Sequence, residues 1–108
     1  MSVEIFGVEE SSSRFNTVVV SGEETFNTFW RKAITELRLQ FIGNGVWLYK
    51  KDLPEILCEF EQVKIYMGRD QSIPESERKY IIRRIDEILE HLKSEWNMVP
   101  EAERLWMG

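Results

Sequence analysis

Three segments of this sequence repeat large apolar residues every three or four positions, the spacing that places them on one side of an α-helix. The first runs from about Glu23 to Gln40, the second from Asp52 to Met67 and the third from Ser72 to Trp96. Short runs that contain glycine or proline separate the segments. We therefore predict three helices, of which the last two form an antiparallel αα-hairpin.

The residues that define these helices fall into apolar stripes and start signals. The stripes are Phe26, Phe29, Trp30, Ala33, Ile34, Leu37 and Phe41 in the first helix, Leu53, Ile56, Leu57, Phe60, Val63 and Met67 in the second, and Ile81, Ile82, Ile85, Ile88, Leu89, Leu92 and Trp96 in the third. Ser21 and Glu24 have the spacing of a capping box. Asp52 is a good N-cap residue, followed by Pro54 in the first turn, and Ser72 opens the third helix in the same way.

Three shorter runs are typical of β-strands. Val3–Val8 partly alternates, Phe15–Val20 is rich in β-branched residues, and Val46–Tyr49 follows the turn-forming residues 43–45. We predict an α+β fold in one domain of 108 residues, with a small antiparallel sheet of about three strands covered by the helices. Residues 97–108 are expected to form a loosely packed tail, in which Pro100 precedes a short turn ending in Trp106.

Composition restricts the classes of partner. With 43% hydrophobic and 12% aromatic residues, the chain has enough apolar material to fold alone. Its formal net charge of −5 argues against a nucleic-acid partner, since neutralising phosphates requires an excess of positive charge. An acidic balance suits either ordinary solubility or the attraction of a basic protein partner.

The single cysteine and the absence of targeting signals indicate a cytoplasmic setting. Cys58 has no partner for an intrachain disulfide, and its apolar neighbours predict a small buried side chain. We recognise no signal peptide, and no run approaches the roughly 20 apolar residues that span a membrane.

The sequence shows no clear catalytic or cofactor motif. His91 is the only histidine, with Glu87 and Glu95 one helical turn away on either side. These three residues suit either a metal or proton-transfer site or a solvated helix face, and the lack of a second histidine favours the solvated face. The abundant carboxylates leave a glycosidase-like pair open, although so short a chain has little room for a deep cleft. We expect no enzyme activity, no metal and no cofactor.

One helix face and one tail residue are the candidate partner contacts. Asp52, Glu55, Glu59 and Gln62 recur every three or four residues, away from the apolar stripe of the second helix. Carboxylates there suit either a plain solvated face or a docking surface that mimics nucleic-acid phosphates for a basic protein. Trp106 is the candidate exposed anchor or a staple for the C-terminus.

A wider set of residues resembles a known family. The residues concerned are Ser21-Gly22, then Phe26, Phe29 and Ile34 on a helix, then Gly45-Val46-Trp47, and two helices that end near Trp96. This arrangement resembles the small immunity proteins of bacterial polymorphic-toxin systems. The resemblance covers residues 15–96 and consists mainly of packing positions. It implies a cytosolic α+β protein that binds one cognate toxin domain, including toxins of contact-dependent growth inhibition. It carries no catalytic motif and no shared binding residue.

From these features we expect an immunity protein that neutralises a basic toxin domain by stoichiometric binding. The alternative is a structural or adaptor protein that forms homodimers through its third helix, which would then expose an apolar seam. A small regulatory domain that binds a ligand is a third interpretation.

Overall fold

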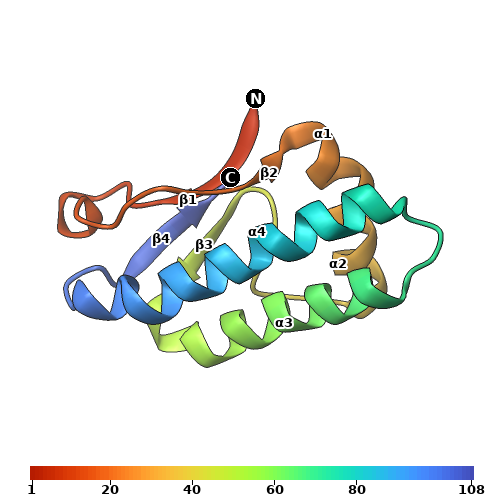
Figure 1. Ribbon diagram of the computed structural model, residues 1–108. Coiled ribbons are helices and arrows are strands. Elements are labelled where there is room, and N and C mark those ends of the chain that lie inside the picture. The colour runs from red at the N-terminus through yellow and green to blue at the C-terminus, as the bar shows by residue number, and fades with distance from the viewer.

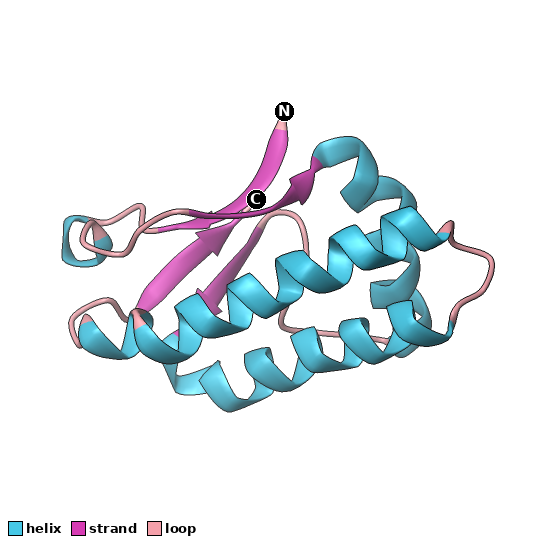
Figure 2. Cartoon of the chain, in the orientation of Figure 1, coloured by secondary structure: helices cyan, strands magenta, loops and turns pink.

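A four-stranded antiparallel sheet with its helices packed against one side forms the architecture of the computed structural model, which describes residues 1–108 (Figures 1 and 2). The strands are β1 (Ser2–Phe6), β2 (Val18–Gly22), β3 (Val46–Tyr49) and β4 (Arg104–Met107). The α-helices are α1 (Glu23–Thr25), α2 (Arg31–Leu37), α3 (Leu53–Arg69) and α4 (Glu75–Ser94). The predicted α+β class and the α3–α4 hairpin are confirmed.

The sheet has one strand more than predicted, and the extra strand comes from the tail. The order is β2-β1-β4-β3, so β4 lies between the N-terminal hairpin and β3, antiparallel to both of its neighbours. The expectation of a loosely packed tail is wrong, because Leu105 and Met107 are fully buried. A strand of four residues whose partners are distant in sequence leaves little local pattern from which to predict it.

The two N-terminal runs predicted as strands form β1 and β2, which pair antiparallel, but neither strand keeps its predicted bounds and the connection between them is longer than expected. β1 ends at Phe6 and β2 begins at Val18, with a 3₁₀ turn at Glu10–Ser12 between them. This loop folds back on itself: a Cβ added to Gly7 would lie 2.1 Å from the carbonyl oxygen of Ser12. Glycine is required at position 7 because no side chain fits there.

The first predicted helix is divided. A π-helical stretch, Phe26–Trp30, separates α1 from α2 and stacks the rings of its two end residues 5.6 Å apart. The expected capping box is wrong: Ser21 belongs to β2, and its hydroxyl donates to the carbonyl of Gly22. The helix ends at Leu37, where Arg38 takes a left-handed conformation with φ of 55°.

The two long helices match their predicted segments closely. Asp52 precedes α3 as expected, although its side chain makes no capping hydrogen bond. α4 ends at Ser94, and Trp96 lies in a following 3₁₀ turn (Trp96–Met98), where its indole donates to the carbonyl of Ala102. Trp96 therefore ties the tail to the core. No helix is both long enough and apolar enough to cross a membrane.

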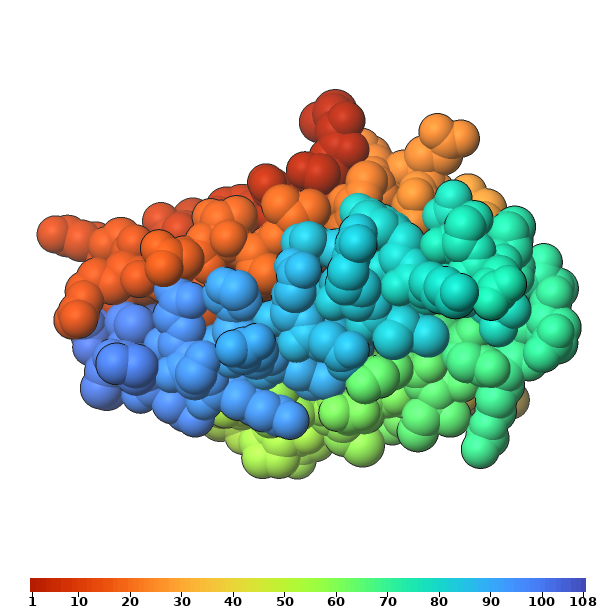
Figure 3. Space-filling view, in the orientation of Figure 1, coloured from red at the N-terminus to blue at the C-terminus, as the bar shows by residue number.

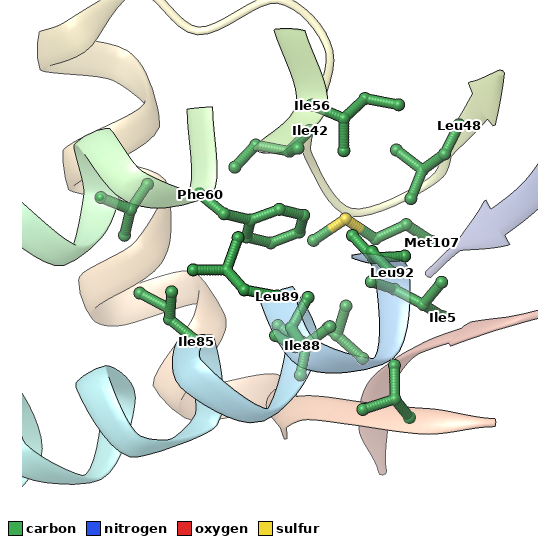
Figure 4. Packing of buried hydrophobic residues seen from close by; sticks show 14 of the residues in the cluster. Ile5, Ile42, Leu48, Ile56, Phe60, Ile85, Ile88, Leu89, Leu92 and Met107 are labelled. Atoms are coloured by element: carbon green, nitrogen blue, oxygen red, sulfur yellow. The ribbon is translucent and has the colours of Figure 1, made fainter. Parts of the chain in front are cut away.

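The core lies between the inner face of the sheet and the helical hairpin. In Figure 4, Ile5, Leu48 and Met107 of the sheet point toward Phe60 of α3 and Ile88 of α4. Figure 3 shows α3 and α4 side by side across one face of the molecule, with the N-terminal segment above them. One cluster of 25 buried apolar residues joins sheet and helices, so the chain has a single core.

Candidate partner-binding surfaces

The four residues predicted on one face of α3 occupy different environments. Glu55 is exposed, whereas Asp52 and Gln62 are partly exposed. Gln62 donates through Nε2 to the Sγ of Cys58 at 3.4 Å. Glu59 is buried, with only 8% of its surface exposed.

Glu59 is a structural residue, which corrects its assignment as a partner contact. One carboxylate oxygen accepts the backbone N–H groups of Phe41 and Ile42 at 2.8 and 3.1 Å, and the other accepts that of Gln40 at 2.9 Å. The side chain thus holds the loop between α2 and β3 against α3. Helical spacing places Glu59 among the polar residues, but it does not reveal that a loop covers this position.

The solvent-facing side of α3 contains three residues that were not predicted as contacts. Cys58, Ile65 and Arg69 are exposed there, near Glu55 and Gln62. The expectation that Cys58 is buried is therefore wrong. Ile65, at 52% exposure, lies off the apolar stripe of the helix. A large apolar residue outside a stripe is a signal that sequence reasoning had available and did not use.

A groove runs between α2 and the C-terminal half of α3, with a volume of about 470 Å³. The helices run in opposite directions here, so Lys32 meets Asp70 and Glu36 meets Tyr66. Its lining residues are Lys32, Glu36, Leu37, Gln62, Ile65, Tyr66, Arg69 and Asp70. The volume lies in the range of natural ligand pockets.

Hydrogen bonds fix one wall of this groove. The Tyr66 hydroxyl donates to Glu36 at 2.7 Å. Lys32 donates to Asp70 at 3.0 Å and to Ser72 at 2.9 Å, and Asp70 also accepts the backbone N–H and hydroxyl of Ser72. These polar groups satisfy one another across the two helices, so the wall is ordered without a ligand.

The same contacts shift two pKa values. The hydrogen bonds from the Ser72 hydroxyl and then Lys32 hold the pKa of Asp70 well below its usual range. Burial and the hydrogen bond to Glu36 raise the pKa of Tyr66. Asp70 is therefore ionised and Tyr66 neutral near pH 7. Arg69 makes no ion pair or side-chain hydrogen bond and offers a free positive charge at the rim.

The groove is lined by acidic, basic and phenolic side chains together with apolar ones. It contains no histidine, cysteine or serine nucleophile among its lining residues. His91 lies elsewhere, on α4, with Nδ1 2.9 Å from the carbonyl oxygen of Glu87 and Nε2 3.8 Å from Glu95. No three histidine, cysteine or acidic side chains come together as a metal site.

Trp106 lies apart from the α3 surface, on the face of the sheet that the helices do not cover. It is paired with Phe6 of β1 and with Trp47 of β3, and the two indoles meet edge to face at 5.0 Å. The structure thus separates the predicted contacts into two surfaces. Trp30 and Trp96 are fully buried, which confirms them as core residues.

α4, the helix predicted as the third, presents no exposed apolar seam. Its apolar residues Ile81, Ile85, Ile88, Leu89 and Leu92 are buried, and Ile82 is partly buried. The homodimer alternative relies on such a seam, so no feature of α4 favours it.

Comparisons with known proteins add no relative. No family model matches the chain, and it matches no curated protein and no solved structure.

Proposed function

We propose that this chain is a cytoplasmic immunity protein that binds a cognate toxin domain in a stoichiometric complex and thereby neutralises it, without catalysis. The observation that supports binding most directly is the α2–α3 groove. The groove combines exposed apolar surface with one polar wall that hydrogen bonds already hold in place, which lowers the entropic cost of docking. The toxin as partner comes from the sequence resemblance.

The proposed contact surface differs from the one expected from sequence. Glu59 is excluded by its burial, and the surface instead joins Glu55 and Gln62 to Ile65 and Arg69. Ile65 is the apolar anchor, because it is the most exposed apolar side chain in the lining of the groove and its removal from water on binding is favourable. Glu55 and Arg69 lie toward opposite ends of α3 and provide charges of opposite sign, which orient a partner.

Coexpression tests the function itself. Toxin domains encoded beside the gene for this chain are expressed in a bacterial host, each with and without the chain, and surviving colonies are counted. The chain is expected to restore growth against one domain and to form a one-to-one complex with it, measured by light scattering. Failure to protect against any domain, with the chain recovered only as a homodimer, would contradict the proposal.

A matched pair of substitutions tests the surface. Ile65→Asp places a charge at the groove and is expected to weaken toxin binding at least about tenfold, measured by calorimetry. Val8→Asp is the control, because Val8 is similarly exposed, at 56% against 52% for Ile65, but lies in the N-terminal loop. Equal affinity of the two variants would show that the toxin docks elsewhere, even where protection itself is observed.

A further inference from the structure

The outer face of the sheet carries a row of aromatic side chains across three adjacent strands. Phe6 of β1 pairs with Trp106 of β4, which pairs in turn with Trp47 of β3. Because paired residues of neighbouring strands project from the same face, the three rings lie side by side. The helices pack on the other side of the sheet (Figure 1), and all three rings are partly exposed.

One end of this row already holds an arginine. The Arg104 guanidinium lies 3.9 Å from the centre of the Trp47 ring, and its Nε donates to Glu9 at 3.0 Å. A guanidinium stacked on an indole and paired with a carboxylate combines cation–π attraction with a charge-assisted hydrogen bond. At this end of the face, Trp47 and Glu9 therefore form an arginine-binding arrangement that Arg104 of the same chain occupies.

The β1 side of the row has the same two components, a ring and a carboxylate, without a cation. The backbone of Glu4 pairs with that of Gly108 through hydrogen bonds of 3.0 and 2.9 Å. Because Glu4 lies two residues before Phe6 in β1, its side chain projects from the same face as Phe6. Phe6 pairs with Trp106, so Glu4 is the diagonal neighbour of Trp106. The Trp106 indole leans over Gly108, where an added Cβ would lie 2.6 Å from Nε1. The Glu4 carboxylate makes no ion pair and no hydrogen bond. An aromatic ring and an unpaired carboxylate are thus neighbours.

We propose that this face binds an arginine-bearing segment of a basic protein partner, with the partner's guanidinium stacked on Trp106 and paired with Glu4. Arginine suits the site better than lysine, because its planar group stacks on a ring and still presents N–H groups to a carboxylate. The carboxylates of Glu4 and Glu9 disfavour a nucleic acid, whose phosphates they repel. This inference goes beyond the proposed function: it concerns a different surface and holds for any basic partner.

Intrinsic fluorescence provides a direct test with the whole chain. Trp47 and Trp106 are the partly exposed tryptophans, whereas Trp30 and Trp96 are fully buried, so a ligand on this face changes the emission of the outer pair. The probes are heptapeptides of alternating glycine and arginine, glycine and lysine, or glycine and citrulline. We expect saturable quenching with the arginine peptide, binding weaker by about fivefold or more with lysine, and none with citrulline.

Two substitutions locate the peptide. Glu4→Gln keeps the shape of the side chain and is expected to weaken binding of the arginine peptide by about tenfold, as is Trp106→Leu. Glu90→Gln is the matched control, because it removes one negative charge from the exposed surface of α4, away from both proposed contact surfaces, and should leave the affinity unchanged. Equal affinities for Glu4→Gln and Glu90→Gln would overturn the proposal, as would equal binding of the lysine peptide or quenching that arises from self-association.

Discussion

The four residues of β4 divide between the two faces of the strand, and the two pairs have different roles. Leu105 and Met107 point inward and are fully buried, whereas Arg104 and Trp106 point outward and remain partly exposed. The inner pair stabilises the fold by removing apolar surface from water. The outer pair belongs to a row of rings and charges in which Trp106 meets Trp47 edge to face and the Arg104 guanidinium lies over Trp47. Alternation along one short strand thus separates the residues that hold the fold from those available to a partner.

α3 repeats this division with charged residues. Glu55 and Glu59 are one turn apart, yet the first is exposed and the second accepts three backbone N–H groups. Chemical identity is the same in both cases, and the packed neighbour determines the role. A carboxylate facing water is free to meet a partner, whereas one facing a loop stabilises the fold.

The largest effect is expected at the inner face of β4. Leu105→Ala removes a fully buried side chain from the middle of the sheet and should lower the free energy of unfolding by about 3 kcal/mol. Urea denaturation followed by circular dichroism measures this change. A loss below about 1 kcal/mol would mean that β4 is not an integral strand, and the contrast between its two faces would fail.

The next effect compares the two carboxylates of α3. Glu59→Ala leaves three backbone N–H groups of residues 40–42 without their acceptor and should lower the free energy of unfolding by about 2 kcal/mol. Glu55→Ala, one turn away and exposed, should change it by less than about 0.5 kcal/mol. The same denaturation experiment compares them, and similar values for both variants would remove the distinction.

A smaller effect is expected at the outer face of β4. Trp106→Ala removes an indole that is partly exposed and contacts Trp47 edge to face, so the free energy of unfolding should fall by about 1 to 2 kcal/mol. Thermal denaturation compares this variant with Leu105→Ala. A loss as large as that at position 105 would show that the outer face is part of the structural core.

The smallest effect depends on pH and concerns the groove. Because the folded state lowers the pKa of Asp70, this residue stabilises the fold above its ordinary pKa of about 4, and that contribution disappears as the pH falls toward the lower folded value. Asp70→Asn should therefore be less stable than the parent at pH 7, with the difference shrinking toward pH 3. Urea midpoints at both pH values measure it. A difference that stays constant would assign no stabilisation to the ionised carboxylate.

Much of the helical structure and the class of the fold were predictable from local pattern. The apolar stripes of α3 and α4 recur over several turns, so one face of each helix must be buried wherever the helix packs. The run Val46–Tyr49 was predicted with its observed bounds as β3. The candidate surface was predictable only in part. Glu55 and Gln62 were predicted and are accessible. Ile65 and Arg69 were not predicted, because they line a groove that exists only where α2 packs beside α3.

Periodicity in this sequence determined by itself that two long amphipathic helices and a small sheet share one core, because burying a repeated apolar face leaves few alternatives. Tertiary structure alone decided that the tail enters the sheet as β4, that Glu59 faces a loop and Cys58 faces water, and that Trp106 joins Trp47 and Phe6. Each of these outcomes depends on a partner far away in sequence. Local spacing determines which face a residue occupies, but only packing determines what that face meets.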